Sequence, residues 1–225
     1  MKDVKLKLTS TVFVDQQSVG NKATITDQYS DKNLIWVNIA NVPKNLTNAI
    51  ISTEDKGFYT NNGVDYKRTL VVVANMVFHF YKTNEGGSTI TQQVIKNLEG
   101  NVNDRTFGIK LREIVTALHL EKQFSKDQIL ETYINIITLG NGCYGVQAAS
   151  NMYFGKDVKD LDLAQCASLV SVIQSPNLNY DPYKHPINVQ DRRNLVLSNM
   201  LKQSMITKAQ YTEAVGEKIT YIPKK

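Results

Sequence analysis

Cysteine and histidine are scarce in this sequence, which has two cysteines and three histidines among 225 residues. The two cysteines, Cys143 and Cys166, define neither a disulfide framework nor a zinc site. The histidines are scattered and form no pair at the helical spacing of metal ligands: His79, His119 and His185. We therefore interpret the three histidines as structural residues.

The sequence also lacks a long apolar run. The longest one, "LVVVANMVFHFY" at residues 70–81, is interrupted by Asn75 and His79. A membrane-spanning helix needs about 20 apolar residues, so we expect this segment to lie on a bilayer or in a core and not to cross a membrane. The first ten residues, "MKDVKLKLTS", carry charge without the apolar segment of a signal peptide.

The rest of the composition is that of a globular protein, with 42% hydrophobic and 21% charged residues. The length suits one domain, or one domain with a small appendage, and allows a sizeable core. The formal net charge of +5 favours acidic partners, which include phosphates, nucleic acid and anionic membrane surfaces.

The first forty residues differ from the rest of the chain. The segments "TSTVFVD" and "KATITDQY" are typical of two strands joined by the turn "QQSVGN", and "LIWVNIA" at 34–40 is a third alternating run. After Pro43 the apolar spacing becomes helical. We predict a mainly α fold with a β-rich appendage at 1–40, a helical domain at 41–217 and the start of a linker at 218–225.

The helical periodicity predicts nine helices, at 44–54, 67–82, 88–98, 105–123, 125–138, 145–153, 162–174, 188–203 and 207–216. Two of them carry clear start signals. Ser125 and Gln128 have the spacing of a capping box, and Asp160 or Asp162 can cap the helix that follows them.

The stretch "GGSTITQQVIKN" at 86–97 combines a helix stop with an unusually polar helix. Ser88 can cap this helix, while Ile90, Val94 and Leu98 fall on one stripe that can be buried. The other side chains are short polar groups or an ammonium, which suit a cleft wall that binds hydroxyls, amides or phosphates. The alternative is a capped helix with a solvated surface.

A pair of acids, Glu54 and Asp55, ends the helix predicted at 44–54 and is followed by Phe58 and Tyr59. A carboxylate at the end of a half-buried helix beside aromatic rings is suited to general acid or base catalysis. The alternative is a solvated acid pair.

The segment "DRTFGIKLREIVTALHLEK" predicts a helix with one apolar stripe facing the core, made of Phe107, Leu111, Ile114 and Leu118. Arg105 and Arg112 fall on nearly the opposite face, with Glu113 to one side towards Lys110. Guanidinium groups placed in this way suit phosphate oxygens. The alternative is a solvated face in which Lys110 pairs with Glu113.

Five segments occur in a fixed order: "EDKGFYTNNGVD", "GGSTITQQVIKN", "RTFGIKLRE", "YINIITLGNGCYGVQAASNMYFGK" and "SLVSVIQSPNLNYDP". With these motifs the chain closely resembles the peptidoglycan glycosyltransferase family over residues 40 to 203. This family comprises the transglycosylase domain of class A penicillin-binding proteins and its monofunctional relatives. The resemblance implies a lysozyme-like, bilobal helical domain that polymerises lipid II. The reaction would invert the configuration at C1 of the sugar and release undecaprenyl pyrophosphate.

The resemblance also implies roles for particular residues. Glu54 matches the general base, and Glu113 matches the second acid, which shapes the donor and diphosphate site. The residues expected at the substrate and its diphosphate are Ser88, Gln92, Gln93, Lys96, Arg105, Lys110 and Arg112. The segment at 70–81 falls where the membrane-inserted lobe begins, so Phe78, Phe80 and Tyr81 are expected to contact the membrane; the alternative is a buried helix.

The expected partners are lipid II, the growing lipid-linked glycan, the bacterial membrane and moenomycin-type inhibitors, and not nucleic acid. The expected location is the extracytoplasmic face of the membrane, with the anchor absent from this chain. No cofactor is required, although the family leaves open a divalent cation, Mg or Mn, at Glu113. No S-x-x-K or K-T-G motif occurs, so a transpeptidase domain would belong to a longer chain.

The sequence departs from the common family pattern at Asn61, where histidine is frequent, and at Glu85, Ile109 and Gln165. These changes remove one cation and add one acid near the expected diphosphate site. Two other functions stay open. The first is a lysozyme-like enzyme that cleaves glycan strands, although such an enzyme needs a general acid and not a group of cations. The second is an inactive scaffold that binds lipid II.

Overall fold

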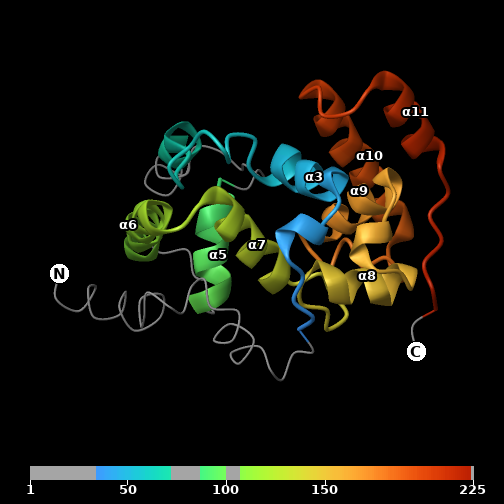
Figure 1. The fold of residues 1–225 in the computed structure, drawn as a ribbon, viewed down its shortest axis with the longest axis horizontal. Coiled ribbons are helices and arrows are strands. Elements are labelled where there is room, and N and C mark those ends of the chain that lie inside the picture. Colours follow the sequence, from blue (N-terminus) through green and yellow to red (C-terminus); the bar gives the residue numbers. More distant parts are fainter. Residues whose placement is uncertain (1–33, 72–86, 100–106, 224–225) are drawn as a thin grey trace. The chain divides into compact units, whose positions relative to one another are not determined.

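The computed structural model describes residues 34–71, 87–99 and 107–223 (Figure 1). The helices in this part are α3 (Lys44–Glu54), α5 (Ile90–Glu99), α6 (Phe107–Gln123), α7 (Lys126–Ile136), α8 (Val146–Phe154), α9 (Leu163–Val172), α10 (Pro186–Lys202) and α11 (Lys208–Gly216). Two short 3-10 helices, η2 (Ile39–Asn41) and η3 (Val158–Asp160), accompany them. The mainly α prediction is therefore confirmed, and the described start of the helix predicted at 67–82 is helical at 66–71.

The chain divides into two compact units. Of the described residues, the first unit holds 57–71, 87–99 and 107–133, and the second holds 34–56 and 134–223. This division agrees with the bilobal expectation, while the predicted boundaries at residues 40 and 217 stay a prediction. Among the described residues, no helix is both long and apolar enough to cross a membrane.

Helix α9 forms the centre of the second unit, where α3 and α10 pack against it and against each other (Figure 1). Its first turn is fixed by a capping box between Asp162 and Gln165, so Asp162 and not Asp160 is the cap. Eight of its ten residues are buried, namely Ala164, Cys166, Ala167, Ser168, Leu169, Val170, Ser171 and Val172. A helix that is apolar or small on almost every side belongs in a core.

The run "LIWVNIA" was predicted as strand-like, and that prediction is wrong, because residues 34–40 form no strand and enter η2 at Ile39. The Asn135 side chain takes the place of a neighbouring strand. Its Oδ1 accepts the Val37 N–H at 2.8 Å, and its Nδ2 donates to the Val37 carbonyl at 2.8 Å. The two strands predicted within residues 9–29 lie outside the described residues.

The segment between α7 and α8 makes a tight turn, closed by an antiparallel bridge between Thr138 and Tyr144. Gly145 ends the turn with φ 78°, and a Cβ at this position would lie 2.6 Å from the Asn135 carbonyl oxygen. Only glycine fits such a conformation and such a close approach.

The end of the chain also packs on the second unit. Arg193 is 2% exposed, and its guanidinium donates to the Val215 and Glu217 carbonyls at 3.0 and 2.8 Å. These bonds satisfy carbonyl groups at the end of α11. The Ile222 N–H donates to the Tyr153 carbonyl at 3.0 Å, so the extended segment after α11 is attached to the core.

In the first unit, α5 packs against α6 (Figure 1). The prediction for the core-facing stripe of α6 is wrong at Leu111, whose side chain is 52% exposed, and Ile114 and Leu118 are only half-buried. The buried face instead carries Lys110, Glu113, Thr116, Ala117 and Leu120. Apolar periodicity misplaced this face because the two charged side chains find partners on α5.

Candidate active site

Thr89, and not Ser88 as predicted, caps helix α5. The Thr89 hydroxyl accepts the Gln92 N–H at 3.2 Å, and the Gln92 side-chain oxygen accepts the Thr89 N–H at 3.1 Å. This reciprocal pair is a capping box. The spacing T-x-x-Q was visible in the sequence, and Ser88 has Thr91 three residues later, which cannot complete the same arrangement.

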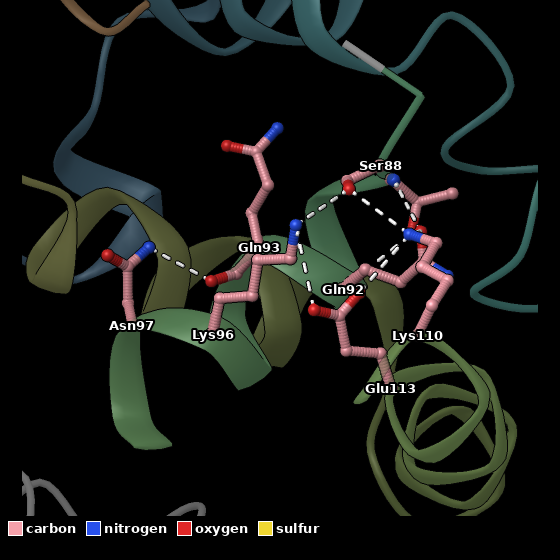
Figure 2. A network of polar contacts seen from close by, with 8 residues as sticks. Ser88, Gln92, Gln93, Lys96, Asn97, Lys110 and Glu113 are labelled. Carbon is pink, nitrogen blue, oxygen red and sulfur yellow. Dashed lines mark hydrogen bonds and ion pairs between the residues drawn. The ribbon is translucent and has the colours of Figure 1, made fainter. Parts of the chain in front are cut away.

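Because Thr89 caps the helix, the Ser88 hydroxyl is available for other contacts. It accepts hydrogen bonds from the Lys96 ammonium at 3.1 Å and from the Lys110 ammonium at 3.3 Å (Figure 2). Lys96 lies two turns along α5, and Lys110 comes from α6. One hydroxyl thus brings ammonium groups from two helices together.

Glu113 completes this group, which we call the lysine cluster: Ser88, Gln92, Lys96, Lys110 and Glu113 (Figure 2). One Glu113 oxygen lies 3.2 Å from the Lys110 Nζ, and the other lies 3.6 Å from the Lys96 Nζ. The Glu113 side chain is 4% exposed, that of Lys110 7% and that of Lys96 26%. Lys96 is therefore the cation of the cluster that solvent and ligands reach most easily.

The pKa of Lys110 is lowered from its ordinary value of 10.5, mainly because burial disfavours the ammonium. The nearby Lys96 charge lowers the pKa further, while Glu113 acts in the opposite direction. Two ammoniums beside one carboxylate leave the cluster with an excess of positive charge. Such a site is suited to an anion with several oxygens, which would meet the ammoniums at little cost in reorganisation.

The two glutamines of α5 have different surroundings. The Gln92 Oε1 belongs to the capping box and also accepts from Lys110 at 3.5 Å. The Gln93 side chain points away from the lysine cluster (Figure 2), and its oxygen accepts the Tyr133 hydroxyl at 3.1 Å. The structure therefore brings together Ser88, Gln92, Lys96, Lys110 and Glu113, and it does not bring Gln93 into that group.

Glu54 is the last residue of α3 and is half-buried, whereas the adjacent Asp55 is buried. The following turn buries the Phe58 ring fully and exposes Tyr59, whose hydroxyl donates to Asp127 at 3.1 Å. Burial and the Asp127 carboxylate raise the pKa of Tyr59. Glu54 belongs to the second unit and the lysine cluster to the first.

The other predicted site residues are placed as follows. Arg112 lies on α6 and is half-buried. Four residues lie outside the described part of the chain, namely Arg105, Phe78, Phe80 and Tyr81.

A divalent cation does not suit the residues that the structure describes. Both Glu113 oxygens already face ammonium groups, which repel a metal ion. No group of three or more histidine, cysteine, aspartate or glutamate side chains lies together among these residues. Hard cations such as Mg²⁺ prefer several oxygen ligands. We therefore derive no step through a metal.

Comparison with known proteins agrees with the family resemblance of the sequence motifs. A protein-family model described as "Transglycosylase" matches residues 21–201. Penicillin-binding protein 1A of Aquifex aeolicus is 40% identical over 185 residues, which cover 82% of this chain and 25% of that protein. Penicillin-binding protein 1A of Pseudomonas aeruginosa is 35% identical over 219 residues, covering 97% of this chain and 26% of that protein.

A solved structure shows the shared fold. The 2.6 Å crystal structure of penicillin-binding protein 1A from Haemophilus influenzae matches with a TM-score of 0.50 and 23% identity. The match covers 85% of this chain and 19% of that protein. The chain spans about a quarter of the length of the curated relatives it matches.

Proposed function

The chain belongs to the transglycosylase family, and on that basis we propose that it is a peptidoglycan glycosyltransferase that polymerises lipid II into glycan strands. The single observation that carries the proposal is the lysine cluster. Two ammoniums from different helices converge on one hydroxyl and one buried carboxylate. This arrangement suits a diphosphate leaving group.

The proposed reaction is an inverting displacement. Glu54 takes the proton from the 4-hydroxyl of the incoming lipid II, whose oxygen attacks C1 of the growing glycan. The bond between C1 and the diphosphate oxygen breaks, and undecaprenyl pyrophosphate leaves with the electron pair. Lys96 and Lys110 stabilise the negative charge that develops on the diphosphate, so this step needs no general acid and no metal.

Glu113 has a positioning role in this proposal. Its buried carboxylate holds both ammoniums and prevents them from repelling each other when no substrate is bound. Ser88 accepts from the same two ammoniums and adds a hydroxyl to the binding surface. Arg105 and Arg112 remain predicted ligands of the diphosphate.

The substrate implies the location and the partners. Lipid II and the growing glycan are membrane-linked, so we place the enzyme at the extracytoplasmic face of the bacterial membrane. We further propose that moenomycin-type inhibitors bind at the diphosphate site. A transpeptidase domain would lie in the part of a longer protein that this chain does not span.

The test is to incubate the protein with lipid II in detergent, with and without EDTA, beside the Glu54→Gln variant. We expect glycan polymer from the parent in both conditions and none from the variant, because glutamine cannot accept the proton. Polymer from the variant at the parent's rate would contradict the role of Glu54. If lipid II binds and no polymer forms, the chain is a scaffold, and degradation of lipid-free glycan would indicate a hydrolase.

A further inference from the structure

A second buried charge pair lies in the first unit, outside the lysine cluster. Glu121, in the last turn of α6, and Lys126, the first residue of α7, approach to 2.7 Å. Their side chains are 8% and 18% exposed. The proposed reaction uses neither residue.

The contacts of this pair reach helix α5 and the turn that follows Glu54 in the chain. The Glu121 carboxylate accepts the hydroxyl of Thr91, which lies on α5 beside Gln92 and one turn before Lys96. The Lys126 ammonium donates to the Asn61 side-chain oxygen at 3.2 Å and lies 4.7 Å from the centre of the Phe58 ring. One ion pair therefore joins α5, α6 and α7 to the turn that follows Glu54 in the chain.

The same turn is fixed at a second place. The Asn61 oxygen accepts the Gly63 N–H at 2.9 Å, and the Gly63 carbonyl accepts the Thr89 hydroxyl at 2.7 Å. A Cβ on Gly63 would lie 2.7 Å from the Glu121 Cγ, so the turn and α6 are in close contact. The turn is thus attached both to the ion pair and to the cap of α5.

We infer that Glu121 and Lys126 are positioning residues of the proposed glycosyltransferase. Through Thr91 the pair fixes the position of α5, which carries Lys96 and begins just after Ser88. Through Asn61 and Phe58 it restrains the chain just after Glu54. The inference rests on the proposed function. The Thr91 contact should affect how tightly the diphosphate binds, and the Asn61 contact should affect the rate of the chemical step.

A purely stabilising role explains this arrangement less well. Replacing a buried ion pair with apolar groups is often neutral for stability, so such a pair is weak support for a stabilising role. Its directional bonds instead fix where four segments lie relative to one another. Misplacing a reacting group by about 1 Å can reduce a rate about 100-fold.

The first test separates the two contacts by single substitutions. We expect Thr91→Val to raise the Kd for undecaprenyl diphosphate about fivefold with little change in kcat, because one hydrogen bond that sets α5 is lost. We expect Asn61→Ala to lower kcat with lipid II about tenfold while this Kd stays within about twofold of the parent. The matched control is Thr132→Val, since the buried Thr132 hydroxyl donates to the Gln128 carbonyl of its own helix at 2.9 Å.

The second test separates positioning from folding. The double variant Glu121→Met, Lys126→Met removes both charges and the acceptor of the Thr91 hydroxyl together, so neither charge is left buried without its partner. We expect it to unfold at nearly the parent's temperature while kcat falls and Kd rises. Parent values of both constants in the double variant would overturn the inference while leaving the proposed function intact.

The two proposals fail in different ways. If the parent makes no polymer, the proposed function fails, and the Kd for undecaprenyl diphosphate still tests the contact through Thr91. If Thr91→Val and Thr132→Val change that Kd equally, the pair has no positioning role towards α5. If Asn61→Ala lowers kcat no more than Thr132→Val does, the contact with the turn after Glu54 has none.

Discussion

The two units of this protein bury charge in different ways: the buried Arg193 of the second unit donates to backbone carbonyls, whereas the first unit buries pairs of opposite charges. The second unit is built around α9, whose buried residues are aliphatic or small, and its Lys184–Asp181 ion pair leaves the lysine 68% exposed. In the first unit the pairs Lys110–Glu113 and Lys126–Glu121 lie largely out of solvent. Apolar burial stabilises a fold, whereas buried charges cost desolvation energy. The first unit thus gives up stability for a fixed arrangement of charges.

The largest expected effect comes from breaking the lysine cluster. We expect Glu113→Gln to lower the rate of polymerisation about 100-fold, because the two ammoniums lose the carboxylate that holds them. The measurement is the initial rate with lipid II, normalised to folded protein by circular dichroism.

The matched change in the second unit is Leu169→Ala. Leu169 is 1% exposed, and its truncation is expected to cost about 3 kcal/mol of unfolding free energy in urea denaturation. The rate per folded molecule should stay at the parent's value. A Leu169→Ala protein that is folded but inactive, or a fully active Glu113→Gln protein, would remove the contrast between the units.

Two of the capping boxes offer a finer comparison, since each uses a glutamine that also accepts from a lysine. Gln92 accepts from Lys110 at 3.5 Å, and Gln165 accepts from Lys156 at 3.1 Å. We expect either glutamine-to-alanine change to cost about 0.5–1 kcal/mol of stability through the lost cap. Only Gln92→Ala should also lower the rate of polymerisation, by about threefold, because Lys110 loses one hydrogen-bond acceptor. Equal rates for the two variants would show that Gln92 acts only as a cap.

The smallest expected effect is a pH dependence of stability. Because the folded pKa of Lys110 lies below 10.5, the unfolded chain binds more protons there as the pH rises towards that value. Stability contributed by this group therefore increases with pH across that interval. We expect the unfolding free energy of the parent, relative to Lys110→Met, to rise as the pH increases towards 10.5. A constant or falling difference would contradict the assigned direction.

Much of the fold was predictable because helix signals are local. The helix predicted at 44–54 has those bounds in the structure, and Ser125 with Gln128 forms the capping box that its spacing indicated. Ile90, Val94 and Leu98 are buried as the stripe predicted. The family motifs also identified five residues that the structure brings into one cluster.

The wrong or missing predictions concern residues whose contacts come from distant parts of the chain. Ser88 was expected to cap α5, yet it faces two lysines, one of them on another helix. The pair Glu121–Lys126 had no signal in "LEKQFSKDQ", where charged residues at a helix end look solvated. Local spacing cannot show that Thr91 and Asn61 approach this pair from elsewhere in the chain.

The sequence by itself determined most of the helices, the capping box of Ser125 and Gln128, and the family, because periodicity, capping and motif order depend on residues near one another in the chain. Only the tertiary structure decided which face of α6 is buried. The apolar spacing favours Leu111 as a buried residue, but Lys110 and Glu113 are buried because Gln92 and Lys96 of α5, and Ser88 just before it, supply their partners. Burial of a charge depends on its contacts, and those contacts form only when the helices pack.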